Sequence, residues 1–417
     1  MSLRSKKLIS LFAAFAILFT LVACSTTPPA ADPESTTTAA TTTAASTTAA
    51  TTLPEDPDGP EDPPAEPVKH EVKNLILIIG DGMGPEHIAA GQLAEGKVYD
   101  FTRWHTTNVN TDSVDKNGYA GVLTDSAASA TALATGTLTY NGYLGIDHKQ
   151  QTLNTIMDYA KQKGKATGVI TTDNLYGATP SGFSAHSANR GDSATITATQ
   201  ITSGVDYLCG LRDDNHYLSR KTAIEAQGYY FSVSPSGLNT TIPEKDKVYL
   251  TLDIENSATP SVTLSQVASS ALKFLERDED GFVLVIEQAH IDKYAHSNNI
   301  DGVVNSMKSL SATVDTVMEW IGDRTDTAVM ITADHETGGL TVSTSTMLQA
   351  KFRNGDNSFY YRFTSGDHTD AQVKLFTYGI TPDFSTYKYY GANHLIKNTD
   401  IFLIMKQTLD KELYIIK

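Results

Sequence analysis

The stretch Asn74-Leu75-Ile76-Leu77-Ile78-Ile79-Gly80-Asp81-Gly82 decides the fold, because an apolar run without polar alternation ends at an acid between two glycines. Such a run is typical of a strand that is buried on both faces, as strands of parallel sheets are. The sequence therefore predicts a central strand with Asp81 just beyond its carboxyl end.

The same pattern recurs and alternates with helical periodicity. We interpret further apolar runs as strands at residues 166–172, 282–286, 328–332 and 373–378. Helical stretches cover residues 152–163, 262–277 and 302–321. This alternation predicts an α/β fold, doubly wound around a mainly parallel central sheet with helices on both faces. Residues 206–261 are less regular, and residues 349–370 indicate a long polar loop.

Ionisable residues follow several of these runs. Asp81, Glu287, Asp334 and His335 lie at or just after the ends of predicted strands. Sites in open α/β sheets form beyond the carboxyl ends of the strands, so these side chains should meet at one edge. One acid in such a place is more often a turn or cap residue, but several together are harder to explain in that way.

The segment after Thr124 combines an acid and a serine with small residues. Asp125-Ser126 precedes Ala127-Ala128, so a helix that begins here would point its free N–H groups at an incoming anion. Considered alone, the pair is most simply a helix cap.

Two further segments offer metal ligands. Asp292 and His296 are four residues apart, so on a helical turn they share a face and can hold one ion, for which zinc is suited. A surface Asp–His pair is the simpler interpretation of that segment alone. His368 adds another histidine from the predicted loop.

The first 67 residues are not expected to be globular. Residues 1–23 have a basic start and an apolar run too short to span a membrane, and the Leu21-Val22-Ala23-Cys24 sequence resembles a bacterial lipobox. We predict a lipoprotein signal, cleavage before Cys24 and lipid attachment there, with ordinary secretion as the alternative. The Thr-, Ala- and Pro-rich acidic residues 24–67 indicate a disordered linker, which leaves residues 68–417 as the folded domain.

Charge excludes one class of partner. The net charge is −16, and residues 1–67 hold three basic and eight acidic residues, so −11 remains on residues 68–417. An acidic domain is a poor candidate for nonspecific nucleic-acid binding, and an anion site in it needs metal ions or a placed arginine. Besides Cys24, Cys209 is the only cysteine, so lipidation of Cys24 would leave no disulfide within the chain.

In this order along the chain, the motifs resemble those of the alkaline phosphatase family. They are Gly80-Asp81-Gly82-Met83-Gly84, residues 124–131, Ala178-Thr179-Pro180, residues 185–190, residues 287–296, Thr332-Ala333-Asp334-His335 and His368. The resemblance covers residues 72–380 and implies the fold of that family together with a centre of two zinc ions and one magnesium ion.

The resemblance also implies which residues bind each ion. One zinc ion would be ligated by Asp292, His296 and His368, and the second by Asp81, Asp334, His335 and Ser126. Magnesium, which prefers oxygen ligands and keeps water, would be held by Asp81, Thr179 and Glu287.

In the implied mechanism, the zinc-activated Ser126 hydroxyl attacks phosphorus, and water then hydrolyses the phosphoserine intermediate. Arg190 would bind two phosphate oxygens, and Asp125 would orient it. Lys293 matches a lysine that contacts phosphate through water in relatives, with an exposed lysine as the alternative. Gly177 departs from the family pattern, because relatives usually have Asp or His there, near the magnesium and its waters.

The predicted protein is therefore an exported, lipid-anchored enzyme on the extracytoplasmic side of the membrane. It would hydrolyse small phosphate monoesters to alcohol and phosphate. Two alternatives are a phosphodiesterase with the same metal core and a catalytically inactive surface lipoprotein that binds metal or phosphate. The resemblance further suggests a homodimer, with membrane contact only through the lipid and no nucleic-acid partner.

Overall fold

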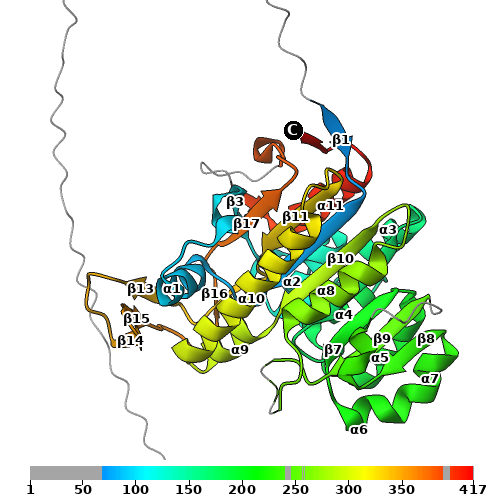
Figure 1. The fold of residues 1–417 in the computed structure, drawn as a ribbon, viewed down its shortest axis with the longest axis horizontal. Helices are drawn as coiled ribbons and strands as arrows, with labels where there is room; N and C mark the ends of the chain where they lie inside the picture. Colours follow the sequence, from blue (N-terminus) through cyan, green and yellow to red (C-terminus); the bar gives the residue numbers. More distant parts are fainter. Residues whose placement is uncertain (1–67, 240–245, 256, 258, 388–394, 417) are drawn as a thin grey trace, which may run out of the picture. The chain divides into compact units, whose positions relative to one another are not determined.

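A ten-stranded sheet forms the centre of the computed structural model, which describes residues 68–416 apart from 240–245, 256, 258 and 388–394 (Figure 1). The predicted signal, Cys24 and the linker lie outside the described residues. The strand order is β18-β3-β17-β11-β2-β10-β6-β7-β9-β8. These strands are β2 (Asn74–Gly80), β3 (His105–Asn110), β6 (Ala166–Thr171), β7 (Tyr207–Leu211), β8 (Tyr229–Ser232), β9 (Lys247–Leu252), β10 (Phe282–Gln288), β11 (Thr327–Thr332), β17 (Val373–Tyr378) and β18 (Leu395–Lys397).

Strand direction in this sheet agrees with the prediction. β17 is antiparallel to both of its neighbours, and every other adjacent pair is parallel. An antiparallel strand begins at the edge where its parallel neighbours end. The start of β17 therefore lies at the carboxyl edge of the sheet, together with the ends of β2, β10 and β11.

Helices cover both faces of the sheet, which confirms the doubly wound architecture (Figure 1). One layer consists of α1 (Pro85–Glu95), α8 (Leu264–Leu275) and α10 (Ile300–Ile321). The other contains α2 (Ser126–Thr135), α3 (Ile156–Gln162), α4 (Ala178–Ser184) and α11 (Asn398–Leu409), and α5 (Ser193–Ser203) packs on α4. Shorter helices are α6 (Asp214–Tyr217), α7 (Lys221–Ala226) and α9 (His290–His296).

The helix α10 shows how sequence sets these boundaries. The Asn299 side chain accepts a hydrogen bond from the Gly302 N–H at 3.1 Å and caps the first turn. Val303, Met307 and Leu310 recur at the three- and four-residue spacing of one helical face and are buried. The helix therefore packs against the sheet through an apolar stripe.

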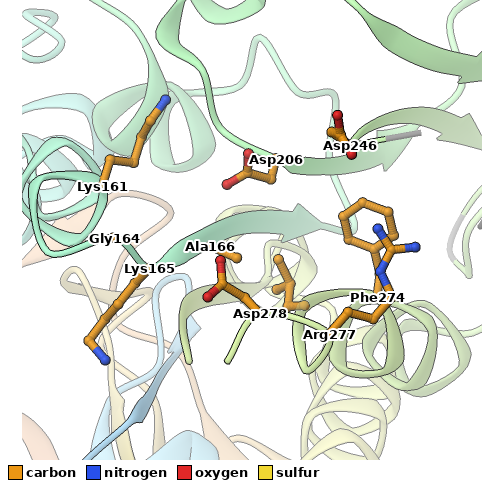
Figure 2. Close-up of a pocket in the computed structure, with 10 residues that line it drawn as sticks. Lys161, Gly164, Lys165, Ala166, Asp206, Asp246, Phe274, Arg277 and Asp278 are labelled. Atoms are coloured by element: carbon orange, nitrogen blue, oxygen red, sulfur yellow. The ribbon is translucent and has the colours of Figure 1, made fainter. Parts of the chain in front are cut away.

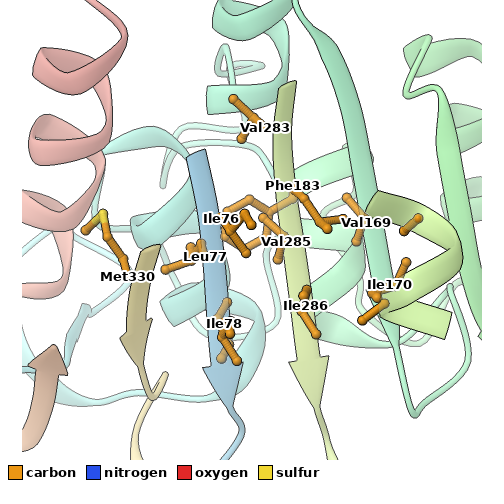
Figure 3. Packing of buried hydrophobic residues seen from close by; sticks show 14 of the residues in the cluster. Ile76, Leu77, Ile78, Val169, Ile170, Phe183, Val283, Val285, Ile286 and Met330 are labelled. Carbon is orange, nitrogen blue, oxygen red and sulfur yellow. The ribbon is translucent and has the colours of Figure 1, made fainter. Parts of the chain in front are cut away.

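The core explains why the strands lack polar alternation. Every residue of β2 and of β10 is buried, because helices cover both faces. In Figure 3, Ile76 and Ile78 of β2 lie beside Val285 and Ile286 of β10. Burial of an aliphatic side chain of this size contributes about 1.5–3 kcal/mol, so these strands form a rigid support for the residues at their ends.

The predicted long loop at residues 349–370 is wrong. It contains β14 (Ala350–Asn354) and β15 (Asn357–Arg362), which form a small antiparallel sheet with β13 (Thr341–Ser343). Phe352 and Phe359 face each other across this hairpin and stack with ring centroids 4.9 Å apart. The aromatic pair gives the hairpin an apolar face that its charged neighbours conceal in the sequence.

Small strand pairs complete the fold. They are β1 (Lys69–Glu71) with β19 (Tyr414–Ile416), β4 (Asp112–Val114) with β5 (Ala120–Leu123), and β12 (Glu336–Thr337) with β16 (His368–Thr369). The last pair holds His368 next to the end of β11. Among the described residues, no helix combines the length and the apolar character needed to cross a membrane.

Candidate metal centre

Two adjacent groups of ionisable side chains lie at the carboxyl edge of the sheet. One comprises Asp81, Asp334 and His335, and the other comprises Asp292, His335 and His368. Within each group, the potential ligand atoms lie within 4.8 Å of one another. His335 belongs to both, so the two groups form one continuous centre.

The first group contains buried oxygen atoms that lack partners. Asp334 Oδ1 accepts from the Gly82 and His335 N–H groups, both at 3.0 Å. Asp334 Oδ2 and Asp81 Oδ1, in contrast, have no hydrogen-bond partner among the described residues. Burial, followed by the charges of neighbouring carboxylates, raises the pKa of Asp81 well above its usual range. A bound cation would satisfy both oxygens and offset this repulsion, so the donor set fits a metal ion.

A glycine is required beside this group. Gly82 has a φ of +73°, which side-chain-bearing residues rarely adopt. A Cβ atom there would also lie 2.8 Å from the Asp292 backbone. The turn after β2 can therefore approach α9 this closely only with glycine.

Two histidines in or beside the second group are oriented by main-chain carbonyl groups. The Nδ1 atoms of His296 and His368 lie 2.6 and 2.9 Å from the carbonyl oxygens of Gly366 and Thr124. Since a carbonyl only accepts, each Nδ1 carries a proton, and Nε2 is the ring nitrogen that faces the candidate site. These Nε2 atoms lie 3.2 and 3.6 Å from Asp292 Oδ1.

His335 lies with Asp81 and Asp334, as predicted, and is also close to a second set of side chains. The prediction assigned it to one ion only, whereas it also belongs to the group of Asp292 and His368, and His296 lies outside both groups. The rings of His335 and His368 stack with centroids 3.5 Å apart. Burial lowers the pKa of His335 to about 3, so its imidazole is neutral and can ligate a metal.

Ser126 opens α2 next to this centre. Its Oγ lies 3.2 Å from His335 Nε2, and the residue is 5% exposed. Asp125 is the N-cap and accepts from the Ala128 N–H at 2.9 Å. The helix start therefore agrees with the prediction, and the Ser129 hydroxyl anchors it by donating to the Asp334 carbonyl at 2.7 Å.

A third set of oxygen atoms surrounds Glu287 at the end of β10. Burial is the main cause that raises the pKa of Glu287 to about 7. The Thr171 hydroxyl donates to its carboxylate. Thr179 in α4 is 1% exposed, and its hydroxyl lacks a hydrogen-bond partner among the described residues. With Asp81, these groups form an all-oxygen donor set, which suits magnesium.

Two cationic side chains lie at the rim, and each is paired with an aspartate. Arg190 donates to Asp125 Oδ2 at 2.9 Å, and its side chain is 42% exposed. Lys293 Nζ lies 2.5 Å from Asp173 Oδ1. The Asp125–Arg190 pair is the one the sequence analysis anticipated, whereas the partner of Lys293 was not predicted.

Sequence reasoning missed two residues near the proposed ligands. The Thr337 hydroxyl donates to Asp292 Oδ1 at 2.6 Å and lies 3.2 Å from His335 Nδ1, and no pattern in the sequence indicated it. Asp173 lies two residues after the end of β6, so its position near a strand end is a signal similar to that of Asp81.

A separate pocket of about 370 Å³ lies at the opposite edge of the sheet (Figure 2). Ala166 begins β6 there, and Asp206 and Asp246 directly precede β7 and β9. Its lysines bind the main chain: Lys165 donates to the Lys73 and Asp280 carbonyls, and Lys161 to the Gly204 carbonyl. These contacts stabilise the starts of the strands. We therefore assign the candidate site to the carboxyl edge of the sheet and not to this pocket.

Comparison with known proteins is consistent with this geometry. The sequence profile of the family described as Alkaline phosphatase matches residues 72–208 and 234–403. Alkaline phosphatase 4 of Bacillus subtilis is 31% identical over 304 residues, which cover 66% of this chain and 63% of that protein. Alkaline phosphatase of Escherichia coli is 29% identical over 420 residues, which cover 81% of this chain and 86% of that protein.

Solved structures give the same result for the fold. Alkaline phosphatase from the Antarctic bacterium TAB5 superposes with a TM-score of 0.71 at 23% identity, over 82% of this chain and 99% of that chain. A variant of that protein, described with magnesium bound in its M3 site, gives a TM-score of 0.70 at 25% identity with the same coverage.

Proposed function

The chain belongs to the alkaline phosphatase family, and from this premise we propose that it hydrolyses phosphate monoesters to an alcohol and inorganic phosphate. The main support is the position of Ser126. Its Oγ lies 3.2 Å from His335 Nε2, at the start of a helix whose cap, Asp125, binds Arg190. A helix amino terminus and a guanidinium both favour an anion, and Ser126 is the first residue of that helix.

The proposed ions follow the donor chemistry. Two zinc ions would be held by the histidine-containing sets, namely Asp292, His296 and His368, and Asp81, Asp334, His335 and Ser126. Magnesium would be held by Asp81, Thr179 and Glu287, which is supported by the magnesium described in the TAB5 variant. Bound zinc supplies positive charge that lowers the pKa of a hydroxyl group and offsets charge on phosphoryl oxygens.

Individual residues of the chain would then have separate roles in the reaction. The Ser126 oxygen loses its proton to solvent and bonds to phosphorus, while the bond from phosphorus to the alcohol oxygen breaks and the alcohol takes up a proton. Water next cleaves the Ser126–phosphate bond and releases phosphate. Arg190 holds two non-bridging oxygens in its planar fork, and Asp125 fixes the orientation of that fork. A diester would have to place an organic group near this fork, so monoesters are favoured.

The test is hydrolysis of an aryl phosphate monoester by the full-length chain loaded with zinc and magnesium. Ser126→Ala should lower kcat by at least about 10³-fold and abolish acid-stable labelling of the protein by a ³²P-labelled monoester. Ser193→Ala is the matched control, because Ser193 also opens a helix directly after an aspartate cap, Asp192. The control should retain wild-type activity.

Two results would overturn the proposal. A higher kcat/KM for the matching aryl diester would favour a phosphodiesterase. No hydrolysis of either ester by the metal-loaded wild type, with Ser126→Ala indistinguishable from it, would favour a metal- or phosphate-binding surface protein.

We also propose that the protein is exported, anchored through lipid on Cys24 and assembled as a homodimer. A labelled fatty acid should be incorporated into the wild type but not into Cys24→Ala. Light scattering of the detergent-solubilised protein should give twice the mass of one chain.

A further inference from the structure

Gly177 has no side chain to offer to the proposed magnesium site, and the carboxylate of Asp173 lies where such a side chain would begin. Gly177 has a φ of −59°, which any residue can adopt, so the φ angle does not require glycine. A Cβ atom at this position would lie 2.9 Å from Asp173 Oδ2 and 2.9 Å from the Asn174 carbonyl oxygen. The Asp173 carboxylate therefore lies in the space toward which a side chain at position 177 would extend.

The contacts of Asp173 fix the carboxylate in that place. Its backbone N–H donates to Thr171 Oγ1 at 2.8 Å, and the Thr171 hydroxyl in turn donates to Glu287. Lys293 Nζ is 2.5 Å from Oδ1 of Asp173, which leaves Oδ2 directed toward Gly177. The Asp173 side chain is 22% exposed, and the ion pair with Lys293 engages one of its two oxygens.

An independent observation indicates a ligand in the same place. Thr179, two residues after Gly177, has a buried hydroxyl that lies near the Glu287 carboxylate but makes no hydrogen bond of standard geometry among the described residues. Asp81 Oδ1 is unpartnered in the same sense. Thr171 links Asp173 to Glu287, because its Oγ1 accepts from the Asp173 N–H and donates to the Glu287 carboxylate. These groups together form an oxygen-lined site with Asp173 at its border.

We propose that Asp173 replaces the missing side chain at position 177 and binds the waters of the magnesium ion held by Asp81, Thr179 and Glu287. Magnesium keeps several waters, so a carboxylate one water away contributes charge and orients the hydration shell. Lys293 then acts by holding Asp173 in place. This inference rests on the proposed function, because it concerns the same metal centre.

The test is calorimetric titration of the zinc-loaded full-length chain with magnesium. Loss of a partner one shell beyond the metal weakens metal affinity by about 10- to 100-fold, so Asp173→Asn should raise the magnesium Kd by that factor. Zinc content should stay at the wild-type value. The matched control is Asp410→Asn, which loses the charge of ion pairs with Lys163 (2.8 Å) and Lys406 (2.6 Å) at the end of α11 and touches none of the proposed magnesium ligands, so its magnesium Kd should stay within about twofold.

Asp173→Ala serves as the second variant, and thermal melting verifies that each variant is folded. A magnesium Kd within about twofold of wild type for both would overturn the inference, as would a wild type that binds no magnesium. If Asp173 only positioned Lys293 toward phosphate, the Ki for phosphate would rise while the magnesium Kd stayed the same, which also overturns it. Failure of the proposed function is a separate result, because the wild type would then bind magnesium without hydrolysing a monoester.

Discussion

Glu287→Gln should stabilise the metal-free protein at pH 8, although it removes a proposed metal ligand. Burial is the main reason that the pKa of Glu287 is about 7 rather than the ordinary 4.5, and this difference corresponds to roughly 3 kcal/mol. The folded pKa is above the unfolded one, so the stability contribution is fully present below pH 4.5 and is lost as the pH rises through about 7. Glutamine keeps an oxygen that accepts from the Thr171 hydroxyl but carries no charge.

The assay is denaturant and thermal unfolding of chelator-treated protein at several pH values. At pH 8 the metal-free variant should be more stable than wild type by about 3 kcal/mol, or about 4 °C in Tm for a domain of this length. Between pH 4.5 and 7, the variant should lose less stability with rising pH than the wild type. With zinc and magnesium restored the order should reverse, because the wild type gains more from binding the ions.

A second buried glutamate provides the control. The pKa of Glu255 is also raised by burial, but this residue binds Gln288 and Ser309 rather than the proposed metal ligands. Glu255→Gln should leave the stabilisation by metal unchanged. Equal unfolding midpoints for metal-free wild type and Glu287→Gln at pH 8 would refute the reasoning, since the charge of Glu287 would then not lower the free energy of unfolding.

Three further predictions concern individual side chains. Arg190→Lys loses the planar fork and should raise the Ki for phosphate about tenfold, whereas an unchanged Ki would remove Arg190 from the phosphate site. Thr337→Val loses the hydrogen bond to Asp292, so zinc should bind more weakly. The chelator concentration that removes zinc should be about 10-fold lower than for the wild type, whereas Thr337→Ser should behave like the wild type. Cys209 is buried, which raises the pKa of its thiol, so a thiol reagent should label it only after denaturation; rapid labelling of the native protein would contradict its placement.

The central sheet was predictable because burial on both faces leaves a local trace in the sequence. β2 and β10 have no exposed residue, and their apolar runs end at Ile79 and Ile286, within two residues of the strand ends. The gathering of Asp81 and Asp334 followed from the rule that parallel strands end at a common edge. His368 was harder to place from the sequence, because it precedes the antiparallel strand β17. It reaches the carboxyl edge of the sheet because β16 pairs with β12, which follows β11.

Features that depend on strand order left no such trace. Asp173 and Lys293 are 120 positions apart and meet because β6 lies beside β10, which no local pattern encodes. The β14–β15 hairpin resembled a loop because only Phe352 and Phe359 form its buried face, and the charged residues around them dominate its composition. The irregular stretch at residues 206–261 likewise adds β7, β8 and β9 to the sheet, and these short strands are separated by polar segments that obscure them in the sequence.

The charge of the proposed centre supports a dianionic substrate. Arg190 and Lys293 are each paired with an aspartate that is not a proposed ligand, namely Asp125 and Asp173, so neither adds net charge. The proposed ligands with negative charge are Asp81, Glu287, Asp292 and Asp334. Three divalent ions would carry six positive charges against these four, which leaves two before the Ser126 hydroxyl loses its proton. A phosphate monoester dianion balances that charge, whereas a diester monoanion leaves one charge unbalanced in a partly buried site, where it is poorly screened. Without the ions the same four carboxylates repel one another, and the raised pKa of Asp81 reports that repulsion together with burial.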